Sequence, residues 1–175
     1  GFPFDIAHTI GLHDARVIHG HPGSKETIEK LSVGPPRFAY AGWASIDIKA
    51  TSRPVPDYDF CLVFDHTYSF EAHAFLQAGR KSEGPVCIMT SGYSSGWCKA
   101  SFGIDLTAVE VTCKARGDER CSFIMAPPHK VAERLKEHYG VTQDALEAKG
   151  FGIPTYFERK TAEEELRRSY AQLKE

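Results

Sequence analysis

The sequence predicts an α+β fold: an antiparallel sheet with helices packed on it, a C-terminal hairpin that bears cysteines, and an extended C-terminal helix. Two β-type runs, at 106–112 and 122–125, flank a short polar loop and so predict the hairpin. Segments of helical periodicity separate the strands, and residues 157–175 are highly charged with apolar residues at heptad spacing. We therefore expect one domain over residues 1–150 and a linker with a helix over 151–175.

The composition argues against several classes of partner. A net charge of −2 gives no general attraction to nucleic acid or to an anionic membrane. No apolar run approaches the length of a membrane span, and no signal peptide is visible. The five cysteines are an odd number without a secretory signal, which favours a reducing, cytoplasmic location. Because the chain begins without Met, we expect it to be part of a longer protein.

The N-terminal part is expected to be helical. Apolar residues recur at helical spacing over residues 5–17, and Ser24 then caps a second, short helix over 25–33. Histidines are frequent here, but none pairs with another at the i,i+4 spacing of a metal-binding helix: His8, His13, His19 and His21. We interpret them as solvated surface residues.

Two strands should follow. The first is expected over 34–50, with Pro35 and Pro36 at its entry and Gly42 at a bend or bulge. An exposed loop over 51–59 leads to an antiparallel partner over 60–66. Apolar residues alternate on both faces of that second strand, so we expect it to lie in the centre of the sheet.

Three helices are predicted after the central strand. The first, over 68–79, should direct Phe70, Ala74 and Leu76 inward and end at Gly79. The second, over 86–102, has a smooth face of small residues, which permits close approach of another helix or of a ligand: Ser91, Gly92, Ser95, Gly96 and Ala100. The third, over 129–140, is a surface helix whose inner stripe is Val131, Leu135 and Tyr139.

The hairpin is the chemically most informative stretch. Cys113 and Cys121 flank its polar loop, so the turn brings the two thiols close together. With Cys87 and Glu110 they are candidate ligands for a soft or borderline metal such as zinc. In a regular strand Glu110 and Cys113 point to opposite faces, so a shared metal requires a bulge or strand end between them. Without a CxxC motif, buried core cysteines or a Cys113–Cys121 redox switch remain alternatives.

The motifs of this stretch resemble the vinyl reductase domain family. They are GYSSGW after PVC, the FG, the VEVTC run, GDERC and MAPP, and the similarity extends from Leu31 to Pro127. The family includes sensory domains of bacterial activators that respond to phenols and methylbenzenes. Its zinc-binding sensors take their ligands from positions that correspond to Cys87, Glu110, Cys113 and Cys121, so the resemblance implies a closed, structural zinc site here.

The resemblance also implies a ligand pocket between sheet and helices. Its candidate residues are Phe38, Tyr40, Trp43, Phe64, His66, Phe70 and Tyr93. In the phenol-responsive relatives a His and a Trp hold the phenol hydroxyl, and this chain has Phe38 and His66 at those positions. A small aromatic or apolar effector is thus expected, bound through partly different polar groups.

These features together suggest a sensor domain and not an enzyme. No P-loop, nucleophile elbow or helical metal-binding His pair is present in the sequence. The C-terminal helix resembles signalling helices that join bacterial sensors to a histidine kinase or another output module. Its heptad stripe predicts a homodimer: Ala162, Leu166, Ser169 and Leu173. The alternative, from the name of the family, is a tetrapyrrole-handling or vinyl-reductase-like enzyme component.

Overall fold

The computed structural model describes residues 2–20 and 27–142, together with scattered residues between 144 and 172. Its sheet has four antiparallel strands in the order β1-β2-β4-β3. They are β1 (Ala44–Ile48), β2 (Leu62–Ser69), β3 (Thr107–Thr112) and β4 (Cys121–Ala126). The predicted α+β class, the hairpin and the central position of the second strand are confirmed. Strand β4 is buried along its whole length, because helices cover both faces of the sheet.

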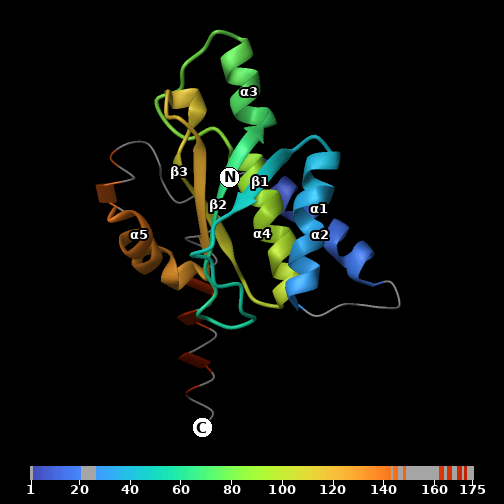
Figure 1. Ribbon diagram of the computed structural model, residues 1–175. Helices are drawn as coiled ribbons and strands as arrows, with labels where there is room; N and C mark the ends of the chain where they lie inside the picture. Colours follow the sequence, from blue (N-terminus) through green and yellow to red (C-terminus); the bar gives the residue numbers. More distant parts are fainter. Residues whose placement is uncertain are drawn as a thin grey trace.

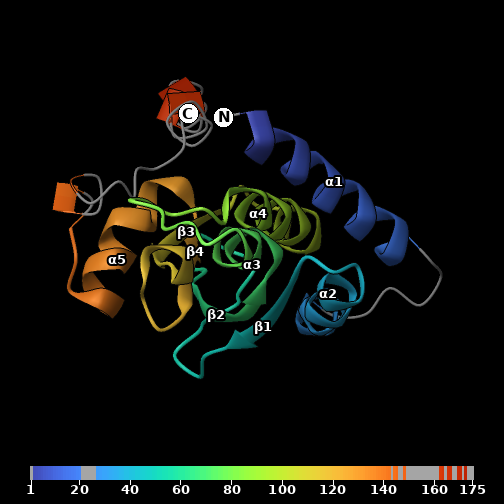
Figure 2. The same ribbon diagram turned by 90° about the horizontal axis from the view of Figure 1, so that it is seen from above.

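Five helices surround the sheet (Figures 1 and 2). Helix α4 (Ile88–Phe102) lies on one face, and α1 (Phe2–His19) packs on α4 as an outer layer. Helix α2 (Thr27–Tyr40) lies beside β1 on the same side, whereas α5 (Val131–Tyr139) covers the opposite face. The short α3 (Phe70–Gln77) lies at one end of the sheet, directly after β2. No helix among the described residues is long and apolar enough to cross a membrane.

The smooth face of α4 is filled by α1. A Cβ atom at Gly96 would overlap the carbonyl oxygen of His8, and one at Gly11 would overlap that of Tyr93. The two backbones therefore approach so closely that only glycine fits at these crossings. Of the two interpretations of this face, close helix packing is the one that the structure shows. The packing also buries His8, so the expectation that all the N-terminal histidines are surface residues was wrong.

The segment 34–40 was wrongly predicted as a strand, since it forms the second half of α2. Two prolines inside a helix each remove a hydrogen bond, which is why the sequence argued for a break. Tight packing offsets the loss: a Cβ atom at Gly34 would lie 2.7 Å from the Trp97 indole nitrogen, and Phe38 is buried on the same side. Gly42, with φ +79°, then makes the turn into β1.

Helix α3 also differs from its predicted orientation. It begins and ends as expected, with Gly79 at φ +64°, but Ala74 and Leu76 are exposed and Ala72 is the buried residue. The cause is Glu71, whose carboxylate accepts hydrogen bonds from the first turn of α4 and so fixes the rotation of α3. The inner stripe of α5 is as predicted. The proposed heptad stripe falls largely outside the described residues, as does Ser24.

Candidate metal centre and ligand pocket

Four buried side chains meet where the hairpin lies against the start of α4. One ligand atom from each of Cys87, Glu110, Cys113 and Cys121 lies within 4.8 Å of the others. Thiolates that bind zinc tetrahedrally at about 2.3 Å lie about 3.8 Å from one another. The Sγ atoms of Cys87 and Cys121 are 3.8 Å apart, which is too far for a disulfide and fits two ligands of one ion.

A bulge in β3 brings Glu110 and Cys113 to the same side of the sheet. The register with β4 shifts between Glu110 and Thr112, where the sequence analysis required an irregularity. Cys113 then ends the strand, and a short turn, Lys114–Arg116, leads to Gly117 at φ +107°. Asp118 holds this turn by accepting a hydrogen bond from the Cys113 amide at 2.8 Å. The local sequence thus builds the geometry that a shared metal needs.

The charges of the cluster call for a cation. Burial raises the pKa of Glu110 to about 9, and the thiolate of Cys113 raises it further. The pKa of Cys113 is lowered because the Cys121 and Cys87 thiols both donate hydrogen bonds to it. Those bonds raise the pKa of the Cys87 thiol. Four acidic groups in one buried site therefore share little negative charge alone, and a divalent metal ion would allow all four to ionise.

The surrounding hydrogen bonds leave the ligand atoms directed at the cluster. Glu110 Oε2 accepts from the Cys87 amide at 3.0 Å, while its buried Oε1 has no hydrogen-bond partner among the described residues. The amide of Lys114 donates to Cys121 Sγ at 3.3 Å, and Ser69 Oγ lies 3.2 Å from Cys87 Sγ. An unpartnered carboxylate oxygen beside three thiols fits a metal site, and all four predicted metal ligands are brought together here.

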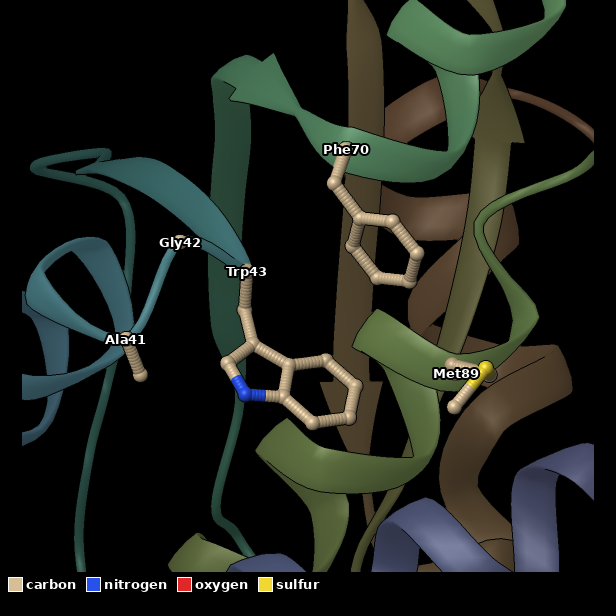
Figure 3. Close-up of a pocket in the computed structure, with 5 residues that line it drawn as sticks. All are labelled: Ala41, Gly42, Trp43, Phe70 and Met89. Atoms are coloured by element: carbon tan, nitrogen blue, oxygen red, sulfur yellow. The ribbon is translucent and has the colours of Figure 1, made fainter.

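A cavity of about 430 Å³ opens near the other side of the first turn of α4 (Figure 3). It is lined by Ala41, Gly42, Trp43, Phe70 and Met89, and the rings of Trp43 and Phe70 point toward one another. Two of these five residues were candidates from the sequence. Ala41, Gly42 and Met89 were missed, although the position of Met89 two residues after Cys87 was a usable signal.

Behind the cavity, the other candidate pocket residues form an aromatic cluster. Phe38 stacks on Tyr93 with ring centroids 4.7 Å apart, and Trp43 lies 5.1 Å from Tyr93. The His66 ring lies 6.0 Å from Phe38 and 5.6 Å from Phe64. Tyr40 is not part of the cluster, because it is 87% exposed on the outer side of α2.

His66 is the unusual member of this cluster. It is completely buried, and neither ring nitrogen has a hydrogen-bond partner in the part of the chain that the structure describes. Burial lowers the pKa of His66 to about 3, so the imidazole is neutral at physiological pH and offers one donor and one acceptor. Buried polar groups without partners destabilise a fold, and they are found where a ligand supplies the missing hydrogen bond.

Comparison with known proteins agrees with the resemblance drawn from the sequence. Residues 67–127 match the family model of the vinyl reductase domain, which confirms that family for this part of the chain. The phenol regulator MopR of Acinetobacter guillouiae is 27% identical over 117 residues, which are 67% of this chain and 21% of MopR. The transcriptional regulatory protein XylR of Pseudomonas putida is 26% identical over 125 residues, 71% of this chain and 22% of XylR. The chain thus spans about a fifth of the length of these relatives.

The fold is also that of a solved sensory domain. The phenol-responsive sensory domain of the transcription activator PoxR, solved with phenol, superposes with a TM-score of 0.68 at 20% identity. The superposition covers 78% of this chain and 68% of the other.

Proposed function

We propose that this chain is the ligand-binding sensor domain of a bacterial regulatory protein, and that its effector is a small, mostly apolar aromatic molecule. The observation that carries the proposal is the buried, unpartnered imidazole of His66 within an aromatic cluster next to a cavity. The similarity to the phenol regulator MopR and to XylR supports the same class of function. A binding role, and not catalysis, is what these observations favour.

The surroundings of His66 define the ligand by chemistry. The cluster offers ring faces for stacking and one neutral imidazole for a hydrogen bond, but no cation to balance a carboxylate. The effector is therefore a neutral aromatic compound with one hydroxyl or amino group. Because Phe38 and His66 replace the His and Trp of the phenol-responsive relatives, its polar group would be held from a different side than in those proteins.

The cluster of Cys87, Glu110, Cys113 and Cys121 is proposed to hold one zinc ion. Three thiolates and a carboxylate suit zinc, and four protein ligands leave no position for a reactive water. Bound zinc would supply structural crosslinking of α4 to the hairpin. Thiolates persist in a reducing compartment, so we place the protein in the cytoplasm.

We further infer that the domain works as a homodimer within a longer protein, whose output is transcription activation or phosphotransfer. The support is the heptad stripe of the C-terminal sequence and the greater length of the curated relatives. Sedimentation at tens of micromolar tests the dimer, and a monomer there would contradict it.

A thermal-shift and calorimetric screen tests the ligand. Phenol, aniline and indole carry one neutral polar group, toluene carries none, benzoate is charged, and a porphyrin represents the enzyme alternative. We expect stabilisation by the first group alone, by about 2.7 kcal/mol at a hundredfold excess over the dissociation constant. Stabilisation only by toluene, benzoate or the porphyrin would contradict the proposed ligand class.

A further inference from the structure

The metal centre and the cavity meet at one short segment, Ser69–Glu71, where β2 ends and α3 begins. Phe70, the middle residue, lines the cavity. Its two neighbours point elsewhere, and both contact the start of α4. Ser69 is buried, with its hydroxyl 3.2 Å from the Sγ of the metal ligand Cys87. Glu71 accepts hydrogen bonds from the amides of Met89 and Thr90, each at 2.9 Å.

The start of α4 has the same double character. Cys87, immediately before the helix, is a metal ligand, and Met89 lines the cavity. Phe70 is also tied to the opposite wall, because its amide donates to the carbonyl of Trp43 at 3.0 Å. Two residues of the cavity wall thus lie one or two positions from groups that contact the metal cluster.

We propose that Ser69 and Glu71 are positioning residues for the metal ligand Cys87, and that they make the metal centre and the cavity share one wall. The inference rests on the proposed metal site. When a cation is bound, Cys87 is a thiolate and the Ser69 hydroxyl can only donate to it. This charge-assisted bond fixes the orientation of the ligand. Glu71 holds the following turn, so a shift of Phe70 displaces Cys87 as well.

The test uses the full chain with zinc or cobalt(II), without any organic ligand. Zinc affinity is measured by competition with a chromophoric chelator, and the cobalt form reports the thiolate-to-metal charge-transfer band. In Ser69→Ala we expect zinc affinity to fall by about 10- to 100-fold, as for other outer contacts of metal ligands. The band should move to longer wavelength, since a thiolate that has lost a hydrogen bond gives up an electron more easily.

Matched variants separate positioning from general loss of stability. Ser94→Ala removes another buried serine of the α4 region, whose hydroxyl has no hydrogen-bond partner among the described residues, and should match the parent in both readouts. Glu71→Gln should weaken zinc binding by up to about tenfold, because the amide group cannot accept both backbone bonds. Phe70→Ala should move the cobalt band, whereas Leu76→Ala, on the exposed side of α3, should not.

Each outcome decides the inference. Ser69→Ala with the affinity and band of the parent would overturn the role of Ser69. If that variant does not fold, Glu71→Gln and Phe70→Ala decide in its place, and parental bands in both would overturn the shared wall. A parent protein that binds neither zinc nor cobalt would instead refute the proposed metal site, and the inference with it.

Discussion

His66 on β2 and Cys121 on β4 are direct partners in the antiparallel ladder. Residues that face each other across such a pair project from the same face of the sheet. The unpartnered imidazole and the metal cluster are therefore neighbours on the face that α4 covers. This adjacency explains why one hairpin can both close the metal site and support the wall of the aromatic cluster.

Removal of one hairpin thiol should remove the metal and the fold together. We expect Cys121→Ala to lose zinc and to yield unfolded or insoluble protein, because metal binding and folding are coupled in closed sites. Cys98→Ala is the matched change, since Cys98 is also buried but lies outside the cluster. It should keep one zinc per chain by elemental analysis. Well-folded, metal-free Cys121→Ala would contradict the structural role of the site.

Protonation of His66 should contribute to acid sensitivity. Its pKa is about 3 in the folded protein and about 6.5 when unfolded, so the unfolded state binds more protons between these values. Stability supplied by the neutral ring is complete above pH 6.5 and falls as pH falls toward 3. From pH 8 to pH 5 the loss is about 2 kcal/mol.

Chemical denaturation of His66→Phe across this range isolates the effect, because acid release of metal is common to both proteins. The variant should lose less stability on acidification than the parent by about that amount. His73→Gln, a change on the exposed side of α3, should follow the parent. Equal pH profiles for His66→Phe and the parent would show that the ring is not buried neutral.

Sequence reasoning anticipated the parts of the structure that local pattern determines. The opposite directions of Glu110 and Cys113 in a regular strand required an irregularity, and the register shift in β3 provides it. Phe38 and Tyr40 show where local pattern failed. Two residues apart on a strand they would share a face, but on α2 they are separated by about 200°. Phe38 is consequently buried and Tyr40 exposed. Tertiary packing of Gly34 on Trp97 decided this, and no local signal reports it.

The contact between α1 and α4 should tolerate no side chain at Gly96. Gly96→Ala places a Cβ atom where the His8 carbonyl oxygen lies, so α1 must move away. We expect a loss of about 1–3 kcal/mol in the free energy of unfolding, as for overpacked cores. Hydrogen exchange should accelerate in α1 before the sheet. Gly96→Leu would displace α1 and not fill a ligand pocket, which corrects the role expected of this position from its sequence. Unchanged exchange in α1 would contradict the tight crossing.

Filling the cavity should abolish effector binding without loss of the metal. Met89→Trp adds a bulky ring to the wall opposite Trp43, where the lining leaves room for it. Ile88→Trp is the matched change, because Ile88 precedes Met89 on the same turn but is 41% exposed and does not line the cavity. With whichever neutral aromatic compound stabilises the parent, we expect calorimetry to show at least about a tenfold weaker affinity for Met89→Trp, a loss of about 1.4 kcal/mol. Ile88→Trp should bind as the parent does, and both variants should retain zinc. Parental affinity in Met89→Trp would mean that the effector enters elsewhere.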